Sequence, residues 1–313
     1  KRVFIEEAAE HLPGNLVITV VIPTKDRDAL LKECLTSVSD AGNDLVSQII
    51  IVDTHERKSS DPKCEKPEGV EYLNEVNINA NVARNIGLSR ARNDIIHFMD
   101  DDDLIESNFY STGLDCLNGT NTVAGVYARL ERQFLDSNMK VYKRNPNFSQ
   151  QTIVGFRELA IGDKTCPLSG YLFRKKCVDE VGGFDESLEA RQDYDLYVRL
   201  SKKYYLIQNP KTTMYHRAHQ APRVSNSDKK ATSYNIICRE KILRCSAFAT
   251  LPKKVQRRFK LNACNALLRE GVWPSCLGLE SIPYSAFISL KKPSVLIRYS
   301  VKKGKRTCSP DPL

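Results

Sequence analysis

Apolar, β-branched runs alternate with amphipathic stretches in the first half of the chain, and this alternation restricts the fold more than any other feature. The runs with the length and composition of buried strands are residues 16–22, 48–52 and 95–99. Residues 26–39 and 79–90 place apolar side chains at helical spacing. Strands that alternate with helices form parallel sheets. The pattern therefore predicts an α/β fold with a mostly parallel sheet, whose first strand ends at Pro23.

Four consecutive aspartates, Asp100 to Asp103, follow directly on the third of these strands. Adjacent carboxylates repel one another by roughly 1 kcal/mol per close pair even in water, so the run is favourable mainly beside a cation. Asp53 follows the second strand. Because ligands bind outside the carboxyl ends of parallel strands, we expect one crevice that suits a nucleotide and a metal-bound diphosphate. Hard oxygen ligands of this kind select Mg²⁺ or Mn²⁺.

Each acidic residue, taken singly, also has an ordinary structural explanation. Asp favours helix caps and turns, so the run at 100–103 could cap the segment that begins at Leu104. Asp53 could simply end its strand, and Asp193 could cap a helix that continues through Leu200. Both interpretations stay open for each residue by itself.

Four segments are similar, in this order, to the motifs of a known family: VVIPTKDRDALLKECLTSV, IIIVDTHE, NVARNIGLSRARNDIIHFMDDDD and GGFDESLEARQDYDLYVRL. Together they resemble the inverting family 2 glycosyltransferases of the GT-A fold, over residues 16–220. The resemblance implies a GT-A catalytic domain at residues 1–220, with a Rossmann-like sheet and flanking helices. It also implies the transfer of a sugar from a nucleotide-diphosphate donor, with UDP-sugar favoured, to a hydroxyl of the acceptor.

The resemblance assigns the nucleotide site position by position. Asp53 would contact the base, Pro23, Thr24 and Arg27 would form the neighbouring wall, and Arg84 would lie near the nucleotide. Where many relatives carry a second Asp and a Gly-Ser turn, this chain has Thr-His-Glu after the first Asp. The base preference beyond uridine therefore stays open.

The metal site follows from the Asp-x-Asp motif of the family. Asp100 and Asp102 supply that spacing; Asp102 is the expected metal ligand, and Asp101 would face the ribose or sugar. The register within four identical residues stays ambiguous. His219 resembles a histidine that approaches the metal or diphosphate in many relatives, with His216 as the alternative.

Asp193 matches the family's catalytic base, with Glu189 and Asp195 as alternatives. Inversion in a single displacement needs a carboxylate near the acceptor, on the face of the sugar opposite the leaving group. A helix N-terminus stabilises an ionised carboxylate, so we expect Asp193 to stay in its basic form at neutral pH. Gln192 stands where a Glu is often found.

The acceptor side is expected in the polar stretch 136–166, which has little periodicity. Side chains that would line it are Tyr142, Lys143, Arg144 and Phe156. A plain connecting loop is the alternative. The acceptor class that the family implies is a glycan or a lipid-linked glycan, in the biosynthesis of a surface polysaccharide.

Positive charge gathers in the C-terminal region, residues 221–313, where 19 Lys and Arg stand against 5 Asp and Glu. We expect helices at 233–249, 253–270 and 285–301, and no run is apolar enough to span a bilayer. The basic helices could pack on the catalytic domain or contact an anionic membrane. We expect a cytoplasmic protein, peripheral at the inner face of the membrane. The ten cysteines, which form no CxxC pair, agree with a reducing compartment.

Two other functional classes share part of this pattern. A sugar-nucleotide pyrophosphorylase shares the sheet and the nucleotide crevice, but it needs a Gly-rich basic loop after the first strand, where this chain has PTKDRD. A non-catalytic nucleic-acid-binding module would explain the basic tail but not the acidic crevice. We therefore expect a metal-dependent glycosyltransferase that does not bind nucleic acid.

Overall fold

The computed structural model describes residues 17–56, 69–118, 120–136, 140–147, 153–161, 166–218 and 237–269. Its strands are β1 (Ile18–Thr24), β2 (Val46–Asp53), β3 (Val70–Asn74), β4 (Ile95–Phe98), β5 (Leu104–Ile105), β6 (Val123–Leu135), β7 (Val141–Asn147), β8 (Ile153–Val154), β9 (Tyr171–Arg174) and β10 (Tyr205–Ala218). Its helices are α1 (Asp28–Gly42), α2 (Ala80–Arg90), α3 (Phe109–Leu117), α4 (Phe156–Ile161), α5 (Lys175–Glu180), α6 (Gln192–Ser201), α8 (Ser246–Thr250) and α9 (Lys253–Arg269). Residues 237–244 are also helical, and two 3₁₀ turns occupy Asn43–Leu45 and Leu168–Gly170.

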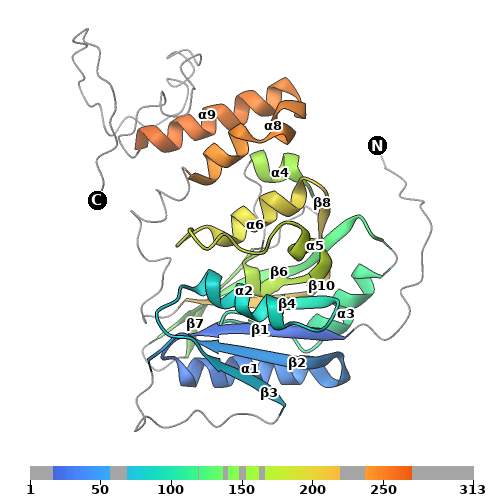
Figure 1. Cartoon of the computed structure of the whole chain (residues 1–313), viewed down its shortest axis with the longest axis vertical. Helices are drawn as coiled ribbons and strands as arrows, with labels where there is room; N and C mark the ends of the chain where they lie inside the picture. The colour runs from blue at the N-terminus through green and yellow to red at the C-terminus, as the bar shows by residue number, and fades with distance from the viewer. Residues whose placement is uncertain are drawn as a thin grey trace.

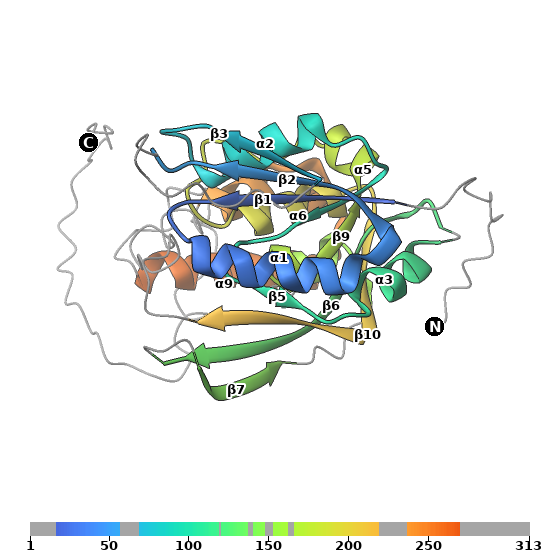
Figure 2. The same cartoon turned by 90° about the horizontal axis from the view of Figure 1, so that it is seen from below.

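These strands form one sheet in the order β3-β2-β1-β4-β9-β6-β10-β5, with β7 beside β6 and β8 beside β10. β1 to β4 are parallel to one another, β9 is antiparallel to both of its neighbours, and β10 is parallel to β6. In Figure 1, α2 and α6 lie above β1, whereas the view from below in Figure 2 shows α1 nearest the viewer. Figure 2 shows β3 and β7 at opposite edges. The mixed α/β architecture with a mostly parallel half agrees with the predicted fold class.

Helix α2 illustrates how the sequence specifies these elements. Asn79 caps it, because its side chain accepts hydrogen bonds from the backbone N–H groups of Asn81 and Val82 at 2.8 and 3.1 Å. Gly87 lets α2 approach the sheet closely, since a Cβ there would lie 2.2 Å from a methyl group of Val21. The predicted helix at 79–90 therefore packs directly over β1.

The first strand is longer than predicted, because Pro23 lies inside β1 and pairs with Val52 of β2. Proline has no N–H group, but none is needed at this position. Val21 accepts a hydrogen bond from the Met99 N–H on the β4 side, and residues two apart face the same side of a strand. Pro23 therefore faces the end of β4, where the pairing with β1 has already stopped.

The polar stretch that the sequence left unassigned contains β7, β8 and α4. Phe156 is the first residue of α4 and is buried in the hydrophobic core. Its place on the acceptor side stays a prediction. Tyr142 of β7, in contrast, is 67% exposed.

The C-terminal helices pack on the rest of the described chain. Phe248, Phe259 and Ala263 are buried in the same hydrophobic core as the sheet, and the rings of Phe248 and Phe259 stand edge to face at 5.2 Å. The predicted helix 233–249 is interrupted at Cys245, between residues 237–244 and α8; residues 233–236 and the predicted helix at 285–301 lie outside the described residues. The division into domains at residue 220 stays a prediction.

Two further observations concern the predicted compartment. Among the described residues no helix has both the length and the apolar character needed to cross a membrane. The described cysteines are all free, and Cys34, Cys166, Cys177, Cys238 and Cys264 are buried.

Candidate functional site

The carboxyl ends of β1, β2 and β4 form one rim. Thr24 and Asp53 pair at the ends of β1 and β2, and the Thr54 N–H donates to the Thr24 carbonyl at 2.9 Å. On the other side of β1, Asp100 follows β4 after a single residue, Met99. The structure thus brings together the strand-end residues that the sequence placed at one edge.

Asp101 joins the loop after β4 to the end of β1. Its carboxylate accepts hydrogen bonds from the Thr24 hydroxyl at 2.7 Å and from the Arg27 guanidinium at 3.0 Å. Burial raises the pKa of Asp101 to about 6, and Arg27 and Thr24 only partly oppose this. Asp101 therefore faces the side of the crevice where the base and ribose are expected.

Asp102 and Asp100 each form an ion pair with a different arginine. Arg27 lies 3.3 Å from Asp102, whereas Arg84 of α2 lies 2.6 Å from Asp100. The Asp100 side chain is 35% exposed and that of Asp102 is 9% exposed. Asp100 is thus the member of this pair that is more open to solvent.

Asp103 points into the protein and was not predicted to have a role. Its carboxylate accepts a hydrogen bond from the Ser169 hydroxyl at 2.7 Å and lies 3.0 Å from Nδ1 of His216. Burial raises its pKa, and the contact with His216 opposes this effect. The Arg217 backbone N–H donates to the Asp103 carboxylate, and the Arg217 guanidinium donates to the Asp102 carbonyl. Asp103 therefore ties the loop to the end of β10.

No local signal in four identical residues could have identified Asp103 as the inward-facing one. Its partners Ser169 and His216 come from 66 and 113 positions away in the sequence. His216, the alternative histidine of the sequence analysis, is half-buried beside this carboxylate. His219 lies outside the described residues.

Asp53 is completely buried at the end of β2. Its carboxylate accepts hydrogen bonds from the Tyr72 hydroxyl and, at 2.9 Å, from the His55 N–H. The Asn74 amide also donates to the Asp53 and His55 carbonyls, at 3.2 and 2.9 Å. Strand β3 thus fixes the turn after β2, a contribution of Tyr72 and Asn74 that sequence analysis did not detect.

Asp193 lies in the first turn of α6 and is partly buried. Burial raises its pKa above the ordinary value of 3.8, and this effect outweighs the Tyr194 N–H, which donates to the carboxylate at 2.7 Å, and the charges of Arg191 and Arg84. Desolvation thus moves this pKa upward against the backbone N–H of the helix N-terminus, and the expectation that Asp193 stays in its basic form at neutral pH remains a prediction.

The side of α2 that faces away from β1 holds the loop that leads to α6. The Asn81 amide donates to the Asp185 and Leu188 carbonyls at 2.9 and 2.6 Å. The Asn85 amide donates to the Phe184 carbonyl at 2.9 Å, and its oxygen accepts the Phe184 N–H at 2.8 Å. Asn81 and Asn85 are four residues apart and so share one helix face, which is the sequence signal that could have identified them.

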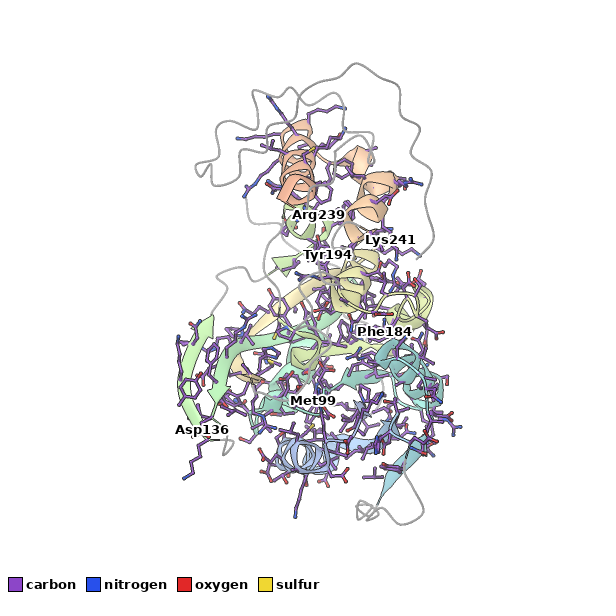
Figure 3. The ribbon with its side chains drawn as sticks, turned by 90° about the vertical axis from the view of Figure 1, so that its left-hand side faces the viewer. Met99, Asp136, Phe184, Tyr194, Arg239 and Lys241 are labelled. Atoms are coloured by element: carbon purple, nitrogen blue, oxygen red, sulfur yellow. The ribbon has the colours of Figure 1, made fainter. Side chains whose placement is uncertain are left out.

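Arg84 contacts both the acidic loop and the segment before α6. It bonds to Asp100, its guanidinium carbon lies 5.5 Å from the centre of the Phe184 ring, and its charge acts on Asp193. Figure 3 shows Phe184 between Met99, at the end of β4, and the C-terminal helices that carry Lys241. One helix thus connects the acidic loop with the segment that carries Asp193.

The described residues contain no group of three or more His, Cys, Asp and Glu side chains arranged to hold a metal. Mg²⁺ sites in nucleotide-dependent enzymes, however, commonly use one or two carboxylates and complete the shell with water and substrate phosphates. The oxygen-only donors at Asp100 and Asp102 fit such a cation. In the structure arginines balance both carboxylates.

Comparison with known proteins places this geometry in a family. Residues 19–182 match the profile of "Glycosyl transferase family 2", which is more than half of the chain. The chain belongs to this family. The family match includes the rim residues and the acidic run, and it ends before Asp193.

An uncharacterized glycosyltransferase of Haemophilus influenzae is 22% identical over 200 residues, which cover 64% of this chain and 65% of that protein. The chain thus spans just under two thirds of this relative's length.

Two solved structures share the fold. The structure of S. aureus TarS residues 1–349 with UDP-GlcNAc has a TM-score of 0.61 at 14% identity and covers 87% of this chain and 79% of that one. The structure of GalNAc-T7 with UDP, GalNAc and Mn²⁺ has a TM-score of 0.56 at 13% identity, with coverage of 88% and 58%. The GT-A fold predicted from the sequence is confirmed.

The inward position of Asp103 leads to a prediction about stability. Replacing Asp103 with Ala should lower the free energy of unfolding by about 3–5 kcal/mol, because His216 and Arg217 would lose a buried charged partner. Asp102→Ala should cost less than about 1 kcal/mol, since Arg27 keeps Asp101. Urea denaturation in chelator-containing buffer measures both values. Equal losses in the two variants would contradict the distinction between these neighbours.

Proposed function

We propose that this protein is an inverting, metal-dependent glycosyltransferase that uses a nucleotide-diphosphate sugar, preferably a UDP-sugar. The observation that carries the proposal is helix α2, whose Arg84 bonds to Asp100 and whose Asn81 and Asn85 bond to the segment that leads to Asp193. One helix thus holds both the acidic loop and the segment that carries a second carboxylate with a raised pKa. Family membership supports the same reaction class and leaves the pyrophosphorylase and nucleic-acid alternatives without a supporting observation.

The donor would lie along the rim. Asp53 would contact the base once its carboxylate turns from the Tyr72 hydroxyl, with Pro23, Thr24 and Arg27 beside it, and Asp101 would face the ribose or sugar. TarS and GalNAc-T7, which share the fold, were solved with UDP-GlcNAc and with UDP and Mn²⁺, respectively, which supports a UDP-sugar donor and a divalent cation. The proposed metal ligand is Asp102, with Asp100 and the diphosphate oxygens.

The cation would neutralise charge on the departing diphosphate. Arg27 and Arg84, which already compensate the acidic loop, would add positive charge on the same side of the sugar. His219 is a further proposed metal-side residue. These groups would lower the barrier by stabilising the charge that develops on the leaving group.

Asp193 would take the proton from the acceptor hydroxyl as that oxygen attacks the sugar carbon from the face opposite the diphosphate. Its burial suits this role, since a base is most effective when its pKa lies nearer the working pH than the ordinary carboxylate value. One displacement of this kind inverts the configuration at that carbon.

The proposed acceptor is a glycan or lipid-linked glycan of a surface polysaccharide. The enzyme would bind this acceptor as a peripheral protein at the inner face of the membrane. The support is charge: helix α9 carries Lys253, Lys254, Arg257 and Arg258 on its exposed side. Its apolar residues Val255 and Phe259 are buried against the protein. The apolar side is thus used for packing, and the cationic side would meet anionic lipid.

The role of Asp193 can be tested by its amide variant. Asp193→Asn should lower kcat for transfer by about 10²–10⁴-fold and leave UDP affinity nearly unchanged, because the carboxylate would act only on the acceptor. In the wild type, the acid limb of the kcat profile should lie above pH 3.8, since burial raises the pKa of the base. Glu189→Gln is the matched control and should keep activity. The assignment fails if Asp193→Asn stays active.

The metal site can be tested separately through binding. Titration calorimetry should show that Mn²⁺ strengthens UDP binding to the wild type, and that Asp102→Asn reduces this gain by about tenfold or more. Metal-free UDP affinity should change little, because Asp53 and Thr24 remain in place. Asp115→Asn, on the exposed surface of α3, is the control. An undiminished Mn²⁺ effect would show that the ion lies elsewhere.

Membrane contact can be measured with vesicles. Changing the four exposed cations of α9 named above to Gln should abolish binding to vesicles rich in anionic lipid, because each cation near such a surface contributes about 1 kcal/mol. A control variant removes four exposed cations elsewhere, Lys32, Arg92, Lys140 and Lys176. Unchanged binding by the α9 variant, or equal loss in the control, would refute the proposal.

A further inference from the structure

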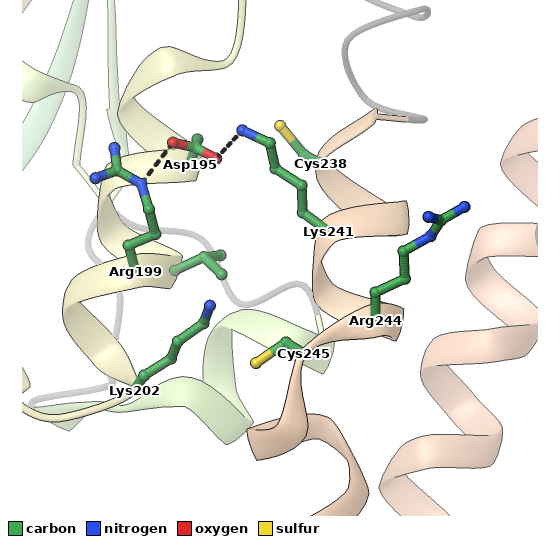
Figure 4. Close-up of a pocket in the computed structure, with 8 residues that line it drawn as sticks. Asp195, Arg199, Lys202, Cys238, Lys241, Arg244 and Cys245 are labelled. Carbon is green, nitrogen blue, oxygen red and sulfur yellow. Dashed lines mark hydrogen bonds and ion pairs between the residues drawn. The ribbon is translucent and has the colours of Figure 1, made fainter. Parts of the chain in front are cut away.

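Lys241 links the C-terminal region to both segments that flank Asp193. It belongs to the helical residues 237–244, and its ammonium nitrogen lies 2.5 Å from the Asp185 carboxylate and 2.9 Å from that of Asp195. Asp185 lies in the loop before α6, and Asp195 lies within α6, two residues beyond Asp193. Figure 4 shows Lys241 reaching across to Asp195 from the neighbouring helix.

Asp195 is held firmly by these contacts. Its side chain is only 3% exposed, and its second oxygen accepts a hydrogen bond from Nε of Arg199 at 2.8 Å. Arg199 also donates to the Val181 carbonyl at 2.7 Å. The Lys241 side chain is itself 40% exposed, so its two carboxylate contacts rather than burial hold it in place.

The second contact of Lys241 fixes the loop. Burial tends to raise the pKa of Asp185, but hydrogen bonds from Lys241 and Ser187 outweigh it and lower this pKa to about 2. The ion pair is therefore formed throughout the neutral range. The Asp185 carbonyl at the same time accepts the Asn81 amide of α2. The loop is thus held by α2 on one side and by Lys241 on the other.

Two more residues of the same segment approach the start of α6. The thiol of Cys238 is buried, with its sulfur 4.0 Å from the Arg191 carbonyl. Arg191, which precedes α6, has a left-handed backbone with φ of 62°. Arg239 lies over the Phe259 ring of α9, with its guanidinium carbon 6.0 Å from the ring centre. Residues 191 and 195 therefore both have partners in the segment that carries Lys241.

We infer that Lys241 is a positioning residue for Asp193, and that the C-terminal region completes the catalytic unit. This inference rests on the proposed role of Asp193 as the base. Lys241 does not need to touch substrate: it fixes the loop and the first turn of α6, and with them the direction of the Asp193 carboxylate. A displacement of about 1 Å in such a group can lower a rate by about a hundredfold.

The test compares Lys241→Met with Lys241→Arg and with Lys202→Met. Lys202 lines the same cavity of about 340 Å³ as Lys241 and is a matched cation that holds neither acidic residue. Measurements are kcat for sugar transfer, UDP affinity with Mn²⁺ by calorimetry, and the pH dependence of kcat. Each variant is also combined with Asp193→Asn.

We expect Lys241→Met to lower kcat by about 10- to 100-fold while UDP affinity changes by less than about twofold. Its acid limb should move to higher pH, because Asp195, two residues from the base, loses a compensating cation. Lys241→Arg should recover most of the rate, and Lys202→Met should behave as the wild type. In the Asp193→Asn background, Lys241→Met should cause no further loss, because both changes act on one step.

Failure of this inference can be told apart from failure of the proposed function. If Asp193→Asn abolishes transfer but Lys241→Met keeps the wild-type kcat, only the positioning role is refuted. Additive losses in the double variant refute it as well. If Asp193→Asn is fully active, the base assignment falls and this inference falls with it. Should Lys241→Met not fold, Asp185→Asn removes the Lys241–Asp185 pair and is judged by kcat and UDP affinity alone, because it removes a negative charge instead of a positive one.

Discussion

Repulsion between four adjacent carboxylates is the constraint on which the rest of this structure depends. The fold relieves it by giving each member of the run a different environment: Asp100 meets Arg84, Asp101 and Asp102 share Arg27, and Asp103 turns inward to His216. These partners come from α2, the loop after β1 and the end of β10. Neutralising the run therefore requires that these segments meet at one rim, which is where a diphosphate and its cation would bind.

Helix α2 connects this rim to the proposed base. Its Gly87 allows close packing on β1, its Arg84 meets Asp100, and its Asn81 and Asn85 hold the loop before α6. The helix thus fixes two groups of acidic residues relative to each other. For one displacement between two bound substrates, that relative position matters more than the pKa of either group.

Helix α9 of the C-terminal region has an apolar side and a cationic side. The apolar side of α9 adds Phe259 to the core, whereas its cations remain at the surface. Through Lys241 the same region also reaches Asp185 and Asp195. The basic region, for which the sequence left packing and membrane contact open, therefore includes a residue with specific partners in the rest of the described chain.

The sequence by itself determined the strands β1, β2 and β4, the helices α2 and α6, and the strand-end position of Asp53 and Asp100, because periodicity and strand polarity are local properties of the chain. It misplaced the end of β1 at Pro23, since only the pairing with β4 shows that no N–H is needed there. Tertiary structure alone decided which of four identical aspartates turns inward. It also decided that burial raises the pKa of Asp193. The physical reason is that partners and desolvation come from residues far apart in the chain, which no local pattern encodes.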